Sequence, residues 1–300
     1  MNAIEIKNLT KNFGAKQALS GLNMTVPVGA IYGFIGENGS GKSTTEKIIC
    51  GLLTPGSGSI KLYERDYTDE EVRAKVGVLI EAPGCFNNYS VWNNLMLQAA
   101  NLSIKNPEAE VAKALKMVRM EGAASNKYKN CSLGMKQRIG IAMALLGNPA
   151  LLVLDEPING LDADGMRIMR EILVEITRSY HCTVVISSHI LGELEKIATH
   201  YGIVRKGKMI KEMTAEELDM GCRTYVALKT QDMNRTKTLL GCKYSRVGEE
   251  NEYLRIYDEV TPEEIVTYLY ENGILVGEIK TDKIGLEEYY IDLMNEKGGR

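Results

Sequence analysis

Residues Gly36 to Ser43, with the sequence GENGSGKS, have the types and spacing of a loop that binds phosphate groups. They fit the pattern GxxxxGK[ST] and lie between an apolar run and a helical segment, which is the context that this pattern requires. In such a loop the backbone N–H groups point inward around the phosphates, and the following helix adds its positive end. A chance glycine-rich turn is the alternative, and the flanking strand and helix argue against it. The residues that we expect to bind the nucleotide here are Gly36, Asn38, Gly39, Ser40, Gly41, Lys42, Ser43 and Thr44.

Two neighbouring carboxylates end a second apolar run, in which Leu151–Leu154 is followed by Asp155 and Glu156. Successive side chains of a strand point to opposite faces, but the strand ends here, so both carboxylates can approach one site. We expect Asp155 and the Ser43 hydroxyl to hold Mg²⁺, and Glu156 to polarise the attacking water as general base. A surface acidic pair that caps a strand is the alternative. The phosphate loop more than a hundred residues upstream argues against it.

Short strands that alternate with helices must position these groups. Ile4, Ile6 and Leu9 alternate with polar residues, as in a half-buried antiparallel strand. Continuous apolar runs are typical of strands that are buried on both faces of a mainly parallel sheet. Three such runs are Ala30–Ile35, Leu151–Leu154 and Thr183–Ile186. The region 84–146 is mostly helical in pattern, with Pro107–Met120 as its clearest segment, and we expect it to be a helical insertion between strands of an α/β domain.

The pattern changes after residue 221, and it contains no chemical motif from there to the end. We expect strands over Thr224–Leu228, Glu252–Tyr257 and Ile274–Ile279. Helices are predicted over Pro262–Glu271, where proline stands near the first turn, and over Leu286–Glu296. The chain therefore divides into a domain of residues 1–221 and a small accessory α+β domain of residues 222–300.

The overall composition excludes several classes of protein. The chain has 300 residues, 44% of them hydrophobic, and its net charge of −3 argues against a protein that coats nucleic acid. We expect no membrane span, because no run of 18 apolar residues occurs, and no signal peptide. The six cysteines form no CxxC pair, and we expect them to be small buried hydrophobic residues in a reducing compartment. We therefore expect a protein of the cytoplasm.

Taken together in this order, the motifs resemble those of the ABC ATPase family over about residues 2–220. Phe13 stands where the family has an aromatic that stacks on adenine, although it could instead be a core residue. The segment Cys131–Met135, CSLGM, takes the place of the family signature LSGGQ and retains only Ser132 and Gly134. In this family the signature of one subunit binds the γ-phosphate of ATP held by the other subunit. The resemblance thus implies a dimer, of this chain with itself or a homologous subunit, around two ATP molecules.

Three further residues acquire roles from the same resemblance. Asp162, in the sequence NGLD, lies in the loop that links the two sites across the dimer. His189 is similar in position to the switch histidine that contacts the γ-phosphate, and with Glu156 and Lys42 it makes up the expected catalytic set. Glu81 replaces the usual Gln that touches Mg²⁺. A carboxylate can bind Mg²⁺ or accept from water but cannot donate as an amide does.

The resemblance also implies a function. Glu81, the degenerate signature and the tail sequence GLEEYY are similar to the bacitracin and lantibiotic exporters, although Glu81 could be a tolerated substitution with the same water-mediated role. We expect an ATP-hydrolysing subunit bound to a membrane-spanning permease at the inner face of the membrane, with no nucleic acid partner. The segment Pro83–Leu97, with Tyr89 and Trp92, would lie near the groove for a permease helix, or these aromatics would belong to the core. The alternative is an ABC-type ATPase that acts on ribosomes or DNA, but such chains have two cassettes or a long coiled coil.

Overall fold

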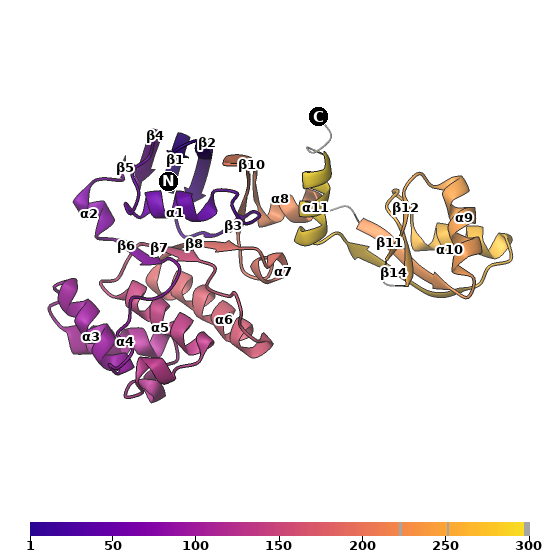
Figure 1. Cartoon of the computed structure of the whole chain (residues 1–300). Helices are drawn as coiled ribbons and strands as arrows, with labels where there is room; N and C mark the ends of the chain where they lie inside the picture. The colour runs from indigo at the N-terminus through magenta and orange to yellow at the C-terminus, as the bar shows by residue number, and fades with distance from the viewer. Residues whose placement is uncertain (222–223, 251, 297–300) are drawn as a thin grey trace. The chain divides into compact units, whose positions relative to one another are not determined.

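The computed structural model describes residues 1–221, 224–250 and 252–296 of the chain. The chain forms two compact units, Met1–Ala215 and Glu216–Arg300 (Figure 1). The division falls at the start of helix α8 (Ala215–Gly221), whereas the sequence pattern placed it at the end of that segment. Within the described residues, no helix has the length and apolar character needed to cross a membrane.

A six-stranded sheet lies at the centre of the first unit. Its strand order is β10-β9-β3-β8-β7-β6, and all neighbours are parallel except β10 and β9. The strands are β3 (Ile31–Ile35), β6 (Val76–Leu79), β7 (Leu151–Asp155), β8 (Thr183–Ser188), β9 (His200–Arg205) and β10 (Lys208–Thr214). Every residue of β3 and β8 is buried, as predicted for continuous apolar runs covered on both faces. The parallel strands therefore bring their carboxyl ends to one edge of the sheet.

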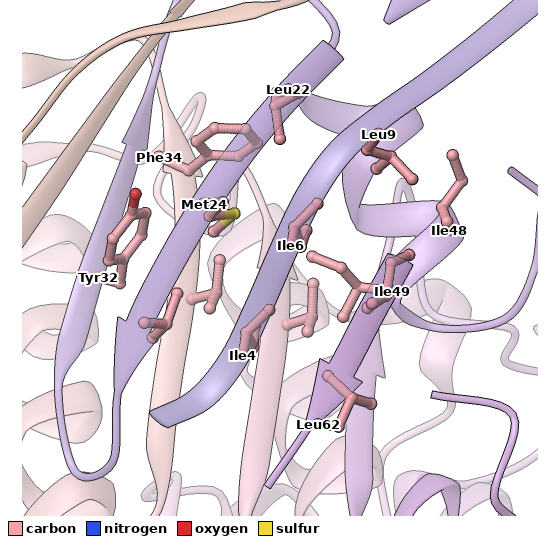
Figure 2. Packing of buried hydrophobic residues seen from close by; sticks show 14 of the residues in the cluster. Ile4, Ile6, Leu9, Leu22, Met24, Tyr32, Phe34, Ile48, Ile49 and Leu62 are labelled. Carbon is pink, nitrogen blue, oxygen red and sulfur yellow. The ribbon is translucent and has the colours of Figure 1, made fainter. Parts of the chain in front are cut away.

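A second, antiparallel sheet has the order β2-β1-β4-β5, with strands β1 (Asn2–Phe13), β2 (Lys16–Pro27), β4 (Ser57–Leu62) and β5 (Arg65–Asp66). The alternation predicted β1 and its buried face, whereas β2, β4 and β5 were not predicted. Figure 2 shows how this face packs on the central sheet and on the helix that follows β3. Ile6 and Met24 lie in one cluster with Phe34 of β3 and Ile48 of α1 (Lys42–Ile49), and each of the four is fully buried.

The helical insertion lies between β6 and β7, as the pattern indicated. It contains α3 (Val91–Asn101), α4 (Pro107–Met117) and α5 (Leu133–Leu145), with 3-10 turns at Glu121–Ala123 and Tyr128–Asn130. Helix α4 ends three residues before the predicted Met120, because Val118 leaves helical geometry and Arg119 takes a left-handed φ of 56°. Two further helices follow strands of the central sheet, α6 (Ala163–Tyr180) after β7 and α7 (Leu191–Leu194) after β8.

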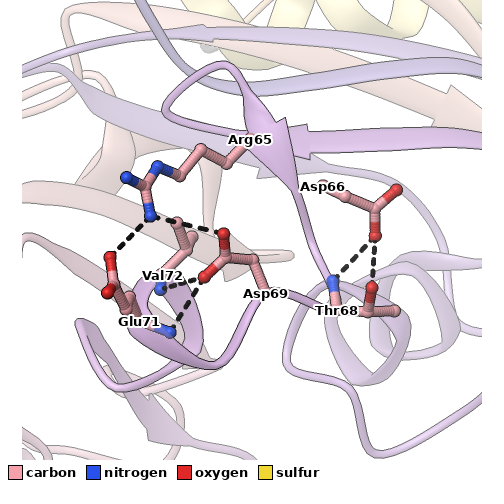
Figure 3. A network of polar contacts seen from close by, with 6 residues as sticks. All are labelled: Arg65, Asp66, Thr68, Asp69, Glu71 and Val72. Carbon is pink, nitrogen blue, oxygen red and sulfur yellow. Dashed lines mark hydrogen bonds and ion pairs between the residues drawn. The ribbon is translucent and has the colours of Figure 1, made fainter.

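Polar contacts fix the short helix α2 (Glu70–Arg73), which leads into β6 (Figure 3). Asp69 caps the helix by accepting from the backbone N–H of Glu71 at 2.9 Å. Arg65 donates to the carboxylates of Asp69 and Glu71, at 3.3 and 2.7 Å. Asp66 accepts from the backbone N–H and the hydroxyl of Thr68. The network therefore holds the start of the strand whose far end leads to Glu81.

The second unit has the element order βαββαβ and the antiparallel strand order β12-β13-β11-β14. This is the ferredoxin-like arrangement. Its elements are β11 (Thr224–Thr230), α9 (Met233–Lys243), β12 (Val247–Glu250), β13 (Tyr253–Ile256), α10 (Pro262–Glu271) and β14 (Val276–Lys283), followed by α11 (Leu286–Glu296). The sequence pattern missed α9 and β12. Val226, Leu254 and Ile265 belong to a core separate from that of the first unit.

The cysteines depart in part from the expectation that all are buried. Cys131 and Cys182 are buried, Cys50 and Cys85 are partly covered, and Cys242 on α9 is exposed. Cys222 lies outside the described residues. Burial raises the pKa of Cys182 to about 12, so this thiol is inert at neutral pH.

We predict that Thr261→Ala weakens α10 by about 1 kcal/mol, because it removes a capping box. The Thr261 hydroxyl accepts from the N–H of Glu264, whose carboxylate accepts in turn from the N–H of Thr261. Hydrogen exchange of α10 amides in the full chain should become faster. Thr267→Ala is the matched control, because Thr267 lies inside the same helix and bonds only the carbonyl of Glu263 in the structure. Equal exchange in the two variants would contradict the capping role.

Candidate functional site

The loop between β3 and α1 needs glycine at the positions where the sequence has it. A Cβ on Gly36 would lie 2.5 Å from the Ser40 hydroxyl and 2.5 Å from a backbone carbonyl oxygen of β9. Gly39 and Gly41 have φ values of 80° and 112°, a region that other residues rarely adopt. A Cβ on Gly41 would also meet Leu19 at 2.8 Å. The loop is therefore a tight backbone curve that other side chains would strain.

The Lys42 ammonium lies inside this curve. Lys42 is buried, and its Nζ donates to the carbonyl oxygens of Gly36 at 2.6 Å and Glu37 at 3.3 Å. The Ser40 hydroxyl is buried and has no hydrogen-bond partner among the described residues. No side chain caps the N-terminus of α1, where Ser43 and Thr44 are partly buried, and Asn38 and Gly39 are exposed. A buried cation, an orphaned hydroxyl and uncapped helix N–H groups fit a polyphosphate.

Asp155 and Glu156 leave the sheet beside β8. The Ser187 hydroxyl donates to Asp155 Oδ1 at 2.7 Å, and the Glu156 N–H donates to the Ser187 carbonyl at 3.2 Å. Glu156 has a left-handed φ of 48°, so the chain turns sharply at the end of β7. The turn explains how two adjacent carboxylates escape the strict alternation of a strand.

His189 contacts one of these two carboxylates, that of Glu156. Its Nδ1 lies 2.7 Å from Glu156 Oε2, and its side chain is 46% exposed. The contact follows from the sheet order, because β8 lies next to β7 and His189 comes one residue after β8. The other two histidines lie elsewhere: His181 ends α6 and His200 begins β9.

The residues at this edge fit Mg²⁺. Asp155 and Ser43 offer carboxylate and hydroxyl oxygens, the ligands that Mg²⁺ prefers. The Glu81 carboxylate has a different partner in this structure: its Oε1 accepts from Lys47 Nζ on α1 at 2.7 Å, and its side chain is 72% exposed. The Lys47 hydrogen bond holds the pKa of Glu81 below its usual value. Glu81 thus carries a full negative charge near neutral pH, two residues beyond the end of β6.

A separate pocket of about 390 Å³ gathers the signature and the loop after Glu156. Ser132 and Gly134 line it together with Gly160 and Asp162. Ser132 caps α5 by accepting from the Met135 N–H at 3.3 Å, and Asp162 caps α6 by accepting from its third residue. The described lining of this pocket includes no residue of the 36–44 loop. The structure therefore does not bring Ser132, Gly134 and Asp162 together with Lys42 in one pocket.

Phe13 does not belong to the core. It ends β1, is 48% exposed, and has Lys11 Nζ at 5.4 Å from its ring centre. An exposed ring of this kind is free to stack on a planar ligand.

Glu46 was not predicted and lies beneath the site. It is fully buried on α1, and neither carboxylate oxygen has a hydrogen-bond partner among the described residues. Burial, followed by the nearby charge of Asp155, raises the pKa of Glu46 well above its ordinary value. The sequence spacing could have indicated that Glu46 is buried, because Glu46 stands four residues after Lys42 and lies on the same face of the helix.

We predict that Glu46→Gln stabilises the first unit at pH 8. A carboxyl with a raised folded-state pKa keeps a proton that the unfolded chain has lost, so stability falls as the pH rises above 4.5 toward the folded value. The slope reaches at most about 1.4 kcal/mol per pH unit, and Gln removes it. Urea unfolding followed by fluorescence of Trp92, the only tryptophan, would measure the effect. The exposed Glu175→Gln should leave the slope unchanged, and a wild-type slope in Glu46→Gln would refute the prediction.

Comparison with known proteins agrees with this geometry. Residues 19–159 match the family model described as ABC transporter. The bacitracin transport ATP-binding protein BcrA of Bacillus licheniformis is 34% identical over 297 residues, 97% of each chain. The lantibiotic transport ATP-binding protein SrtF of Streptococcus pyogenes is 41% identical over 209 residues, 70% of this chain and 90% of the relative. The structure of cbiO1 from Clostridium perfringens, part of the ABC transporter complex cbiONQ, has a TM-score of 0.67 at 27% identity and covers 73% of this chain and 91% of that one. The chain therefore belongs to the ABC transporter family, as an ATP-binding subunit that hydrolyses ATP.

Proposed function

We propose that the chain powers export of an antimicrobial peptide, a lantibiotic or a drug through a membrane-spanning permease. The observation that carries the proposal is the extent of the similarity. The likeness to the bacitracin transport subunit runs over 97% of both chains and so includes the second unit, whereas the likeness to the solved cassette covers 73% of this chain. Glu81 and the degenerate signature CSLGM are two further features that support a similarity to the bacitracin and lantibiotic exporters.

In the proposed reaction, the loop 36–44 and Lys42 bind the ATP phosphates, and Phe13 stacks on adenine. Ser43, Asp155 and Glu81 would hold Mg²⁺, which neutralises charge on the phosphate oxygens. Glu156 accepts a proton from the attacking water as general base. His189 Nδ1 contacts Glu156, which leaves Nε2 to contact the γ-phosphate. The 2.7 Å contact also orients the Glu156 carboxylate before water arrives.

The two separate sites support a dimer. Ser132 lies at the N-terminus of α5, so its hydroxyl, the positive helix end and Arg138 on the same lining would bind an anion, and the described lining includes no residue of the 36–44 loop. A second subunit related by a two-fold axis would bring its ATP to this pocket and complete both sites at once. Asp162, on the same pocket wall, would lie between the two nucleotides.

A groove of about 370 Å³ supports docking of the permease. Leu79, Pro83 and Leu102 line it, and the exposed rings of Phe86 and Tyr89 stand in the same 79–102 region, with centres 5.3 Å apart. Tyr89 is therefore not a core aromatic, while Trp92 is partly buried. A groove lined in part by apolar side chains can accept an amphipathic helix. Its position just after Glu81 would connect the nucleotide site to the membrane partner, at the inner face of the membrane.

Glu156→Gln tests the hydrolytic mechanism. We expect ATP to bind as in the wild type and the hydrolysis rate to fall about 10²- to 10⁴-fold, because the amide cannot accept the proton. Binding of labelled ATP and release of phosphate would be measured on the same preparation. Glu175→Gln, an exposed substitution on α6, should keep full turnover. Unchanged turnover in Glu156→Gln would overturn the assignment of the base.

The double variant Phe86→Ser with Tyr89→Ser tests whether the exposed aromatic rings of the 83–97 segment dock the permease. We expect it to keep basal ATP hydrolysis, to lose co-purification with the permease, and to abolish peptide resistance in cells. The control is Tyr270→Ser, which removes an even more exposed ring from the second unit. If the double variant still co-purified at the wild-type level, these two rings would not be part of the docking site. If ribosomes or nucleic acid co-purified in place of a membrane protein, the export proposal itself would fail.

A further inference from the structure

An ion pair outside the catalytic set links the first helix to the segment after β6. Lys47 Nζ of α1 donates to Glu81 Oε1 at 2.7 Å, and the two side chains are 31% and 72% exposed. No other ion pair of the described residues includes Glu81. The pair therefore determines where the Glu81 carboxylate lies in this structure.

The two partners differ in how firmly the backbone holds them. The Lys47 carbonyl accepts from the N–H groups of Leu52 and Leu53, at 2.8 and 3.1 Å, so the end of α1 is fixed. Glu81 has a left-handed φ of 66°, which is unfavourable for a residue with a side chain. The lysine is thus the anchored partner, and Glu81 is the exposed partner on a strained backbone.

The position of Lys47 on α1 sets up a competition. Lys47 lies four residues after Ser43, about 6 Å further along the helix axis. The ammonium and a divalent cation held near Ser43 and Asp155 both attract the same Glu81 carboxylate and repel each other. A glutamine in place of Glu81 would carry no charge, and Lys47 would not hold it in this way.

We propose that Lys47 is a positioning residue that competes with Mg²⁺ for Glu81, and so raises the Mg²⁺ concentration at which Glu81 joins the nucleotide site. The inference rests on the proposed role of Glu81 as a metal ligand. Because the pair is exposed, its effect is modest and weakens with salt. Lys47 thereby makes the position of the Glu81 carboxylate depend on the metal–nucleotide complex rather than on nucleotide alone.

Four chains in the Glu156→Gln background test the proposal: the background itself, Lys47→Met, Glu81→Gln and the double variant. Mg²⁺ is titrated into each chain with ATP present. The readouts are bound labelled ATP and the fluorescence of Trp92, which lies at the start of α3 after the 81–90 segment. We expect Lys47→Met to lower the half-saturating Mg²⁺ concentration about two- to five-fold, the range for an exposed ion pair. When Glu81 is replaced by Gln, Lys47→Met should not change the Mg²⁺ midpoint. Lys47→Arg, which keeps the positive charge, should give the midpoint of the background chain.

Salt gives a measurement that needs no Lys47 substitution. Raising the ionic strength should shift the Mg²⁺ midpoint of the background chain, which retains Glu81 and Lys47, toward the midpoint of Lys47→Met. The salt-induced shift of the Glu81→Gln chain serves as the reference. Lys237→Met is the control, because it breaks an exposed pair with Glu249 in the second unit and should change nothing.

The outcomes separate this inference from the proposed function. If Lys47→Met shifted the Mg²⁺ midpoint equally in chains with Glu81 and in chains with Gln at position 81, the proposed competition would be wrong. An unchanged Mg²⁺ midpoint in Lys47→Met, with ATP binding intact, would also overturn it and leave the ATPase mechanism standing. Loss of ATP binding in the background chain, by contrast, would contradict the nucleotide site itself.

Discussion

The register of three parallel strands is the constraint on which the candidate site depends. Ile35 of β3 pairs with Ser188 of β8, and Asp155 of β7 pairs with Ser187. The phosphate loop, the two carboxylates and His189 all follow these strand ends directly, so one sheet edge gathers groups that are more than a hundred residues apart. A shift of one residue in either pairing would turn the side chains of that strand to the opposite face. The buried strands prevent such a shift because both of their faces are packed.

Two buried groups of α1, Lys42 and Glu46, influence the charge at this edge. The Lys42 ammonium donates to carbonyl oxygens of its own loop. Glu46 lies on the same helix near Asp155, and its carboxylate has no hydrogen-bond partner among the described residues. A polyphosphate would give Lys42 a full anionic partner in place of two carbonyl dipoles. Burial raises the pKa of Glu46 and so favours its uncharged form, which reduces its opposition to that gain. The loop is therefore positive where the ligand is expected, in spite of the acidic residues around it.

The sequence predicted the parts of the fold and site that are local. The glycine-rich loop, the run that ends in Asp155 and strand β1 each have their pattern within a few adjacent residues. Helix α9 was missed because Asn, Thr, Gly and Cys within it have poor helix propensity, and the core of the second unit fixes it instead. The contacts of Lys47 with Glu81 and of Glu156 with His189 join distant segments, so only the tertiary structure reveals them.

The architecture of the signature pocket argues for an assembly larger than one chain. Ser132 and Asp162 each cap the helix that they begin, so the N-termini of α5 and α6 are held in place and open on the same pocket wall. The N-terminus of α6 has the carboxylates of Asp162 and Asp164 beside it, whereas the N-terminus of α5, with Arg138 on the same lining, is the place where an external phosphate would bind. In the proposed dimer, ATP on the phosphate loop of a second copy would supply that phosphate. Because each copy would need what the other holds, a two-fold arrangement would satisfy both pockets, and closure of the dimer would then depend on nucleotide at both sites.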